Sequence, residues 1–320
     1  MSAEPVEPAD PVFDPNASRI WLVGSMRDRG LTRGDVDSRQ WARPSRGVRL
    51  WLPPGTREPD DRVYAAAAAL SPGSVIGGWA AAWLHGVTWA DGLSPAGAPT
   101  PVTLVIPPEG FVPRGRGIRG RRSELTAMDV DERQGLPVTS AIRTAFDLAR
   151  WSKSLDSAVA WLDAMCRAGP IEPAALAAYV AQHKGWVGVG RVREALELVD
   201  ARSKSPQESR LRVAWHLADL PTPLVNVSIW RIGGGFVGEA DLLDPESGFV
   251  GEYDGWTHRR RDRRELDHGR VRRFADAGLT VRTYVDRDLA SSPMALQASL
   301  RAGHAAALTV TRRQWTLEPD

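Results

Sequence analysis

The stretch GGGFVGEADLLDPESGFVGEYDGWTH, residues 233–258, predicts the central feature of the C-terminal part of this chain. Two apolar runs flank Pro-Glu-Ser-Gly at 245–248. This is strong turn chemistry, so the stretch predicts an antiparallel β-hairpin. With those four residues as the loop, Asp244 faces Phe249. Asp241 then lies directly across from Glu252.

The same register gathers acidic side chains on one face of the hairpin. Glu239 faces Asp254, and side chains two residues apart on a strand share a face, so both join Asp241 and Glu252. Opposed like charges destabilise a sheet unless they are hydrated, partly protonated or neutralised by a cation. Mg²⁺ and Mn²⁺ take oxygen ligands of this kind. The alternative is that this acidic face is simply exposed to water and binds no ion. A shift of one residue in the strand register would place the acids of one strand on the other face.

A fifth acid precedes the hairpin. Ser-Pro-Gln-Glu at 205–208 begins a predicted helix over 206–219. Glu208 has two open roles that do not exclude one another. It can lie over the carboxylate site, or it can bond the start of its own helix as part of a capping box with Ser205.

The elements around the hairpin complete a small α/β core with a mixed sheet. The pattern predicts a strand over 224–231, a basic helix over 260–277, a strand over 279–285 and a helix over 293–308. The basic helix contains most of RRRDRRELDHGRVRR (259–273), which has eight arginines against three acids.

Residues from about 203 to 291 resemble the Vsr-like (very-short-patch-repair-like, domain of unknown function 559) group of the PD-(D/E)XK nuclease superfamily. The resemblance implies a restriction-endonuclease-like core that hydrolyses phosphodiester bonds with Mg²⁺ or Mn²⁺. It implies that Asp241 and Glu252 are the metal acids, the Tyr253 backbone carbonyl a further ligand and Glu208 the helix acid. The matching pieces are Ser-Pro-Gln-Glu-Ser-Arg-Leu-Arg (205–212), Glu-Ala-Asp-Leu-Leu (239–243), Gly-Glu-Tyr-Asp-Gly-Trp-Thr-His (251–258) and Gly-Leu-Thr-Val-Arg (278–282).

One position departs from the family pattern. The usual lysine, two residues after the second acid, is Asp254 here, and a carboxylate cannot supply its positive charge. His258 and Arg259 are the candidates to replace it, with His258 acting as general acid or base because its ordinary pKa suits both roles. The basic helix is expected to contact the DNA backbone, although a solvated face paired with its own acids is the alternative. The arginines assigned to this contact are Arg259, Arg260, Arg263, Arg264 and Arg270.

The front of the chain predicts three further segments. Residues 1–16 are Pro-rich and acidic and predict a disordered tail. Residues 17–57 predict a winged helix, with helical runs at 18–30 and 32–41 followed by a basic strand at 46–52. Residues 58–201 are Ala-rich and predict a mainly helical middle domain, broken by one β-rich patch with a buried strand over 101–107. A linker leads from there into the last domain, residues 202–320. The basic stripe expected on the winged helix consists of Arg33, Arg43, Arg46 and Arg49.

Residues from about 25 to 150 resemble the antitoxin of type IV toxin–antitoxin abortive-infection systems (AbiEi). This resemblance implies a DNA-binding winged helix and a second domain used for repression or for contact with a toxin protein. A small structural domain that packs on the nuclease is the alternative. The matching pieces are Gly-Leu-Thr-Arg (30–33), Arg-Gly-Val-Arg-Leu (46–50), Ala-Ala-Ala-Trp-Leu-His-Gly (80–86), Gly-Leu-Pro-Val-Thr-Ser (135–140) and Arg-Thr-Ala-Phe-Asp-Leu (143–148).

Composition sets the remaining bounds. The 320 residues are 42% hydrophobic and 25% charged with a net charge of +2, which are soluble globular values. With one cysteine, no signal pattern and no long apolar window, we expect a cytoplasmic protein that uses neither a membrane nor a small-molecule cofactor. The expected function is a DNA-binding protein with a metal-dependent endonuclease-like domain. The alternative is a non-catalytic DNA-binding regulator or antitoxin. DNA is the expected partner, with a cognate toxin as a second.

Overall fold

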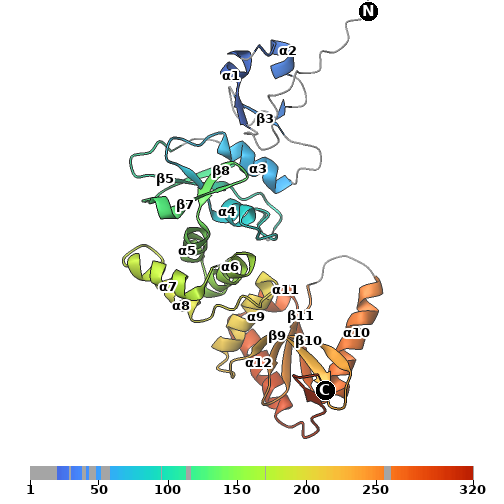
Figure 1. The fold of residues 1–320 in the computed structure, drawn as a ribbon. Helices are drawn as coiled ribbons and strands as arrows, with labels where there is room; N and C mark the ends of the chain where they lie inside the picture. Colours follow the sequence, from blue (N-terminus) through green and yellow to red (C-terminus); the bar gives the residue numbers. More distant parts are fainter. Residues whose placement is uncertain are drawn as a thin grey trace, which may run out of the picture. The chain divides into compact units, whose positions relative to one another are not determined.

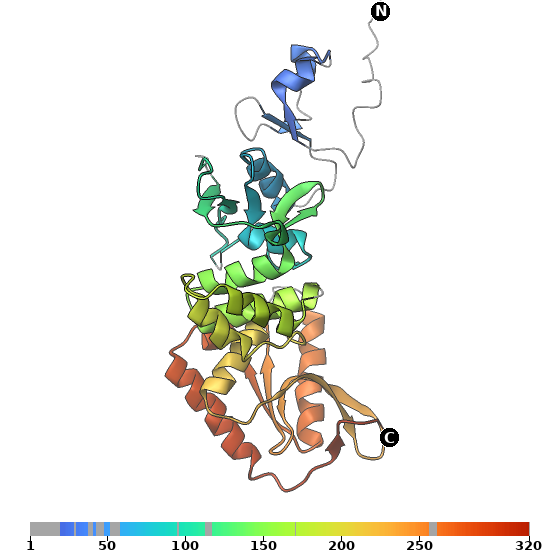
Figure 2. The ribbon, with the colours of Figure 1, turned by 60° about the vertical axis from the view of Figure 1, so that its left-hand side comes forward.

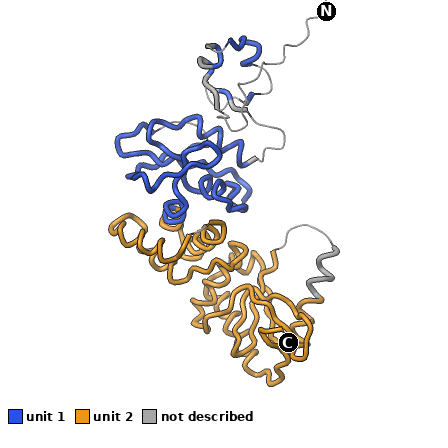
Figure 3. The backbone as a smooth tube through the Cα atoms, viewed as in Figure 1, with its two compact units in different colours: residues 1–147 blue, residues 148–320 orange. Residues whose placement is uncertain are grey.

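The computed structural model describes residues 20–28, 30–37, 41–42, 48–51, 58–94, 96–112, 117–169, 171–255 and 261–319. The chain forms two compact units, residues 1–147 and residues 148–320 (Figure 3). The secondary structure is mixed helix and strand, so the predicted α+β class is confirmed. None of the described helices combines the length and the apolar character needed to cross a membrane.

The second unit is built around a five-stranded mixed sheet with the order β12-β11-β10-β9-β13. Neighbouring strands are antiparallel except β11 and β12, which are parallel. This is the predicted succession of three antiparallel strands followed by a parallel fourth. The strands are β9 (Leu224–Arg231), β10 (Phe236–Asp244), β11 (Phe249–Tyr253), β12 (Thr280–Tyr284) and β13 (Trp315–Thr316).

Helices cover both faces of this sheet (Figures 1 and 2). Trp215 packs with Leu242 and Phe249 on the face covered by α9 and α12, and Phe274 of α10 packs with Val250 on the other face. All five of these side chains are fully buried, so each face has its own apolar core. The helices are α9 (Pro206–Leu217), α10 (Arg261–Asp276), α11 (Asp286–Leu289) and α12 (Pro293–Ala307).

The hairpin of β10 and β11 has the predicted register. Leu242 pairs with Gly251, Leu243 with Val250, and Asp244 with Phe249. The loop between them closes with a hydrogen bond from the Gly248 amide to the Asp244 carbonyl at 2.9 Å. The Asp244 carboxylate accepts from the loop amides, which stabilises the turn.

Three further helices belong to the second unit, and a buried polar network joins one of them, α6, to α9 and to the segment after α8. Arg212 of α9 forms an ion pair with Asp163, which also accepts from the Ser209 hydroxyl at 2.6 Å and from the Asp200 amide at 2.7 Å. The predicted boundary after residue 201 therefore falls inside this unit. These helices are α6 (Leu155–Ala168), α7 (Pro173–Gln182) and α8 (Val189–Leu196), which follow α5 (Ala141–Trp151).

The first unit contains a five-stranded mixed sheet with the order β6-β5-β4-β8-β7. Helices take up more of residues 58–201 than strands do, as predicted, and the predicted strand over 101–107 is confirmed as β5. The five-stranded sheet to which this strand belongs was not predicted. Its strands are three to five residues long, too short for a clear alternation, and Arg119, Arg121 and Arg122 make β6 resemble a basic loop. The elements are α3 (Glu58–Ala67), β4 (Val75–Gly77), α4 (Gly78–Leu84), β5 (Val102–Ile106), β6 (Ile118–Arg122), the 3-10 turn η1 (Ala127–Asp129), β7 (Val130–Arg133) and β8 (Leu136–Thr139).

A smaller three-stranded antiparallel sheet, with the order β1-β3-β2, lies at the start of the described chain. Residues 20–22 were expected to be helical, but their backbone pairs antiparallel with β3. The winged helix stays a prediction, and residues 1–16 lie outside the described part. The elements are β1 (Ile20–Leu22), α1 (Val23–Asp28), α2 (Arg33–Val36), β2 (Trp41–Ala42) and β3 (Val48–Trp51).

Candidate functional site

Two carboxylates meet where the β10–β11 ladder ends. The Tyr253 amide donates to Oδ2 of Asp241 at 2.8 Å, and the Asp241 amide donates to Oε1 of Glu252 at 3.2 Å. Each strand therefore binds the other strand's carboxylate through its backbone. This exchange holds Asp241 and Glu252 together, as the predicted register requires.

Burial makes the charged form of both groups unfavourable. Burial raises the pKa of Asp241 to about 6, and the Glu208 carboxylate raises it further, against the lowering effect of the Tyr253 amide. Burial likewise raises the pKa of Glu252 to about 7, followed by repulsion from Asp241, while Arg270 lowers it. Glu252 is only 1% exposed. Strongly raised carboxyl pKa values in one small site are typical of functional sites.

Glu208 caps the start of α9. The Ser205 hydroxyl accepts from the Glu208 amide at 3.1 Å and donates to Oε1 of Glu208 at 2.9 Å. Oε2 of Glu208 accepts from the Lys204 amide and from Nδ2 of Asn226, both at 2.8 Å. Both carboxylate oxygens of Glu208 thus have protein donors. The negative charge of Glu208 repels those of Asp241 and Glu252, whereas its hydrogen bonds with Ser205 stabilise the start of α9.

The other two acids of the predicted cluster lie toward solvent. Glu239 is half exposed and forms an ion pair with Lys204. Asp254 is exposed, and its amide donates to the Tyr284 carbonyl at 2.8 Å. Of the four hairpin acids, Glu252 is therefore buried and Asp241 half-buried, and Glu208 on α9 is buried as well.

Arg270, predicted as a DNA contact, reaches the buried pair from α10. Its Nη2 atom lies 2.7 Å from Oε2 of Glu252. The side chain of Arg270 is 32% exposed. Sequence reasoning did not connect Arg270 with the carboxylates, because the contact depends on how α10 packs on β10. Asn226 and Lys204 were missed for the same reason.

The buried pair has the chemistry for a hard divalent cation. Oε2 of Glu252 is buried and makes no hydrogen bond of good geometry, so its contact with Nη2 of Arg270 is the one that a cation would have to replace. Two carboxylates completed by water suit Mg²⁺, which commonly keeps several waters when bound to protein. Within the described ranges, no group of three or more His, Cys, Asp or Glu side chains could hold a metal ion. Any cation here would therefore depend on Asp241 and Glu252, and the Tyr253 carbonyl stays a predicted ligand.

The remaining predicted DNA contacts divide into four groups. Arg33 is highly exposed, with Asp37 at 3.7 Å. Arg49 is buried, contrary to the predicted exposed stripe, because its guanidinium binds the Val36 carbonyl and the Asp37 carboxylate, both at 2.7 Å. Arg263 and Arg264 lie on α10, of which only the backbone is described there. The predicted DNA contacts outside the described residues are Arg43, Arg46, Arg259 and Arg260, and His258, the predicted general acid or base, also lies outside them.

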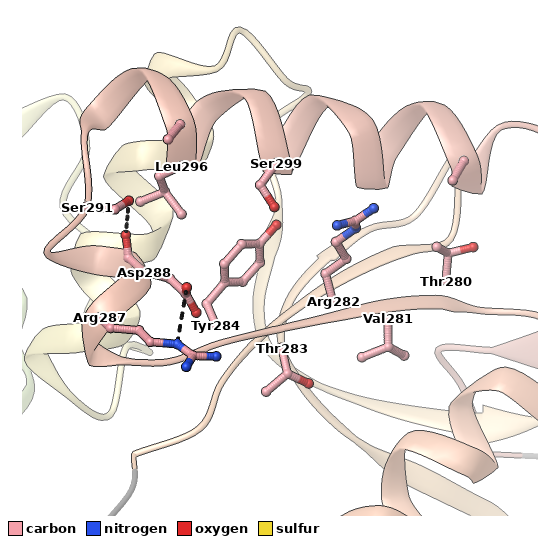
Figure 4. A pocket seen from close by; sticks show the side chains of 12 residues that line it. Thr280, Val281, Arg282, Thr283, Tyr284, Arg287, Asp288, Ser291, Leu296 and Ser299 are labelled. Atoms are coloured by element: carbon pink, nitrogen blue, oxygen red, sulfur yellow. Dashed lines mark hydrogen bonds and ion pairs between the residues drawn. The ribbon is translucent and has the colours of Figure 1, made fainter.

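A surface hollow of about 800 Å³ lies elsewhere in the second unit, between β12, α11 and α12 (Figure 4). Tyr284, Arg282 and Ser299 line it, and neither Asp241 nor Glu252 does. Asp288 there accepts from the Val285 amide at 2.9 Å and so belongs to the start of α11. The hollow is separate from the carboxylate pair.

Asn226 provides a first test of how the site is built. It lies inside β9 with φ of 48°, a left-handed conformation that Asn adopts more readily than most residues. We expect Asn226→Ala to lower the free energy of unfolding by about 1–3 kcal/mol, because strain is added and the bond to Glu208 is lost. Asn226→Gly loses only the bond and should cost less. Equal losses in urea unfolding of the two variants would contradict the role of the backbone conformation.

The raised pKa values predict a pH dependence of stability. Between about pH 4 and pH 7 the folded chain keeps protons on Asp241 and Glu252 that the unfolded chain releases. Their contribution to stability is present below pH 4 and is lost as the pH rises through 6 and 7. We expect the stability difference, wild type minus Glu252→Gln, to fall by about 1–3 kcal/mol across this window in EDTA. Urea unfolding at several pH values checks this, and a constant difference would contradict it.

With this geometry in place, the class of the protein can be stated: a two-unit α+β protein with a buried carboxylate pair at the end of a hairpin. Residues 75–198 match the family model described as the AbiEi antitoxin C-terminal domain. The match covers β4 to α8 and ends before α9. The antitoxin part of the predicted resemblance is confirmed for these residues, while the Vsr-like nuclease part stays a prediction.

The crystal structure of the RV2827C protein from Mycobacterium tuberculosis is similar to this chain with a TM-score of 0.38 and 15% sequence identity. The similarity covers 66% of this chain and 83% of that one. No curated protein matches the sequence.

Proposed function

We propose that this protein is a DNA-binding regulator of the antitoxin type, with a toxin protein as its second partner. The match of residues 75–198 to the AbiEi antitoxin C-terminal domain carries this proposal. The domain matched by that model would serve repression or toxin contact. The small sheet and helices before it would bind DNA.

The described arginines support a DNA contact in the front part. Arg33 lies on α2 with its guanidinium largely in solvent, where it can reach a phosphate. Arg49 cannot make the same contact while it binds Val36 and Asp37, and its role is to hold α2 against β3. Phosphate contacts of this kind make binding strongly dependent on salt.

A binding titration tests this function. We expect the full chain to bind duplex DNA from its own promoter region, with an affinity that decreases as the salt concentration rises. Arg33→Gln should make the plot of log affinity against log salt concentration less steep, by about the slope of one phosphate contact. Arg133→Gln, which removes a half-exposed arginine paired with Asp131, should leave this slope unchanged. Fluorescence anisotropy at several salt concentrations measures both. Failure to bind any duplex at low salt would contradict the proposal.

The carboxylate site favours a second candidate function, metal-dependent hydrolysis of phosphodiester bonds. The observation behind it is the pair of Asp241 and Glu252, with raised pKa values and with Oε2 of Glu252 left without a hydrogen bond of good geometry. Asp241 and Glu252 would hold Mg²⁺ or Mn²⁺. When bound, the cation would polarise the phosphate and lower the pKa of a water.

The protein residues would do the remaining work. The hydrogen bonds from the Asp241 and Tyr253 backbone amides would keep the two carboxylates in position. Lys204 would offset part of the negative charge around Asp241. Cleavage assays on duplex and single-stranded DNA with either metal test this candidate. Operator binding that is unchanged in Asp241→Asn would separate the regulator from the enzyme, because only the enzyme needs that carboxylate.

A further inference from the structure

The position of Arg270 is determined by close packing between α10 and β10. A Cβ atom at Gly238 would lie 2.9 Å from the Phe274 ring and 3.5 Å from Cγ of Arg270, so the glycine permits this approach. One turn further on, Nε of Arg273 donates to the Val237 carbonyl at 2.9 Å. The stem of Arg270 is therefore held beside β10, with its guanidinium at Glu252.

The contact between Arg270 and Glu252 uses one nitrogen only. Nη2 lies 2.7 Å from Oε2, but Nε of Arg270 is buried with no hydrogen-bond partner. Oε2 of Glu252 has no hydrogen bond of good geometry either. A two-pronged arginine–carboxylate pair would satisfy both nitrogens and would be considerably stronger. This pair is thus incomplete on both sides.

The charges around the site also remain unbalanced. Asp241, Glu252 and Glu208 are three acids that influence one another, and Arg270 is one positive charge. Lys204 offsets Asp241 in part but is itself paired with Glu239. A divalent cation at the pair would neutralise more charge than a guanidinium does, and it would repel the guanidinium from the same oxygen.

We propose that Arg270 is the internal counter-ion of the Asp241–Glu252 pair, that a divalent cation displaces it, and that the released guanidinium then binds a DNA phosphate. This inference rests on the second candidate function, the cation site. Arg270 is partly exposed, so its guanidinium can turn outward while its stem stays against Gly238. Cation binding and DNA binding then strengthen each other.

The test measures DNA binding in EDTA and in Ca²⁺, a cation chosen to limit cleavage, at constant ionic strength. The wild-type protein should gain roughly fivefold or more in affinity with Ca²⁺. Its salt slope should increase by about one phosphate contact. Arg270→Gln should show neither change. Arg272→Gln, which removes an exposed arginine from the same helix, should keep both.

Calorimetry without DNA provides a second readout that does not depend on activity. Arg270→Gln should bind Ca²⁺ roughly fivefold more tightly than the wild type, because the competing charge is gone. Arg270→Lys should bind it with an affinity close to that of the wild type. A residue that merely supports the fold would weaken cation binding when replaced.

The possible outcomes distinguish a failure of the cation site from a failure of the role proposed for Arg270. If the wild type binds no divalent cation, the cation site and the inference both fail. If it binds the cation through Asp241 but Arg270→Gln has unchanged or weaker cation affinity, the inference alone is overturned. A wild type that gains no DNA affinity with Ca²⁺ overturns it as well.

Discussion

In the presence of Mg²⁺ or Mn²⁺ the wild-type protein is expected to unfold at a clearly higher temperature, and Asp241→Asn is expected to lose this increase. At a cation concentration about 100 times the dissociation constant, binding to the folded state alone adds about 2.7 kcal/mol of stability. For a unit of this size that corresponds to an increase of about 5–10 °C. The asparagine can still accept the Tyr253 amide, so the variant removes charge and keeps the local bond.

The control is Glu239→Gln. Glu239 lies on the same strand and its replacement removes the same charge, but the residue is half exposed and paired with Lys204. It should keep the increase in melting temperature. Thermal unfolding followed by circular dichroism, with and without EDTA, gives the comparison. A shift that persists in Asp241→Asn, or that is absent from the wild type, would remove the cation site and with it the nuclease candidate.

The second large effect is expected at the network between α6 and α9. Replacing Asp163 with Ala leaves Arg212, which is only 7% exposed, without its ion-pair partner. It also removes the acceptor of the Ser209 hydroxyl and of the Asp200 amide. Breaking a buried pair by removing one partner costs about 3–5 kcal/mol, because a charge stays buried and unpaired. We expect a loss of this size in urea unfolding.

A matched control joins the same two helices. Asp156 and Arg210 form an ion pair at 3.6 Å, with both side chains more than a third exposed. Asp156→Ala should cost no more than about 1 kcal/mol, because water screens and replaces such a pair. A double change, Asp163→Leu with Arg212→Met, should recover part of the loss. Similar stabilities of Asp163→Ala and Asp156→Ala would show that the network does not unite the helices as described.

Sequence reasoning succeeded best in the C-terminal half. The turn at 245–248 and the alternation on either side of it predicted the register of β10 and β11, which the pairing of Leu242 with Gly251 confirms. It was less complete for the middle of the chain, where it predicted the helices and one strand, β5, but not the five-stranded sheet that contains this strand. Short strands such as β4 and β6 form because their neighbours cover them, and that information is not local.

The amino-acid sequence alone determined which carboxylates meet, because turn chemistry and a two-residue alternation act between near neighbours in the chain. Only the tertiary structure decided what surrounds them. Arg270 reaches Glu252 because α10 packs closely on Gly238, and Asn226, in a left-handed conformation on β9, donates to Glu208 of α9. Both contacts join separate elements through packing. These contacts therefore depend on the three-dimensional fold, and the spacing of residues along the chain does not predict them.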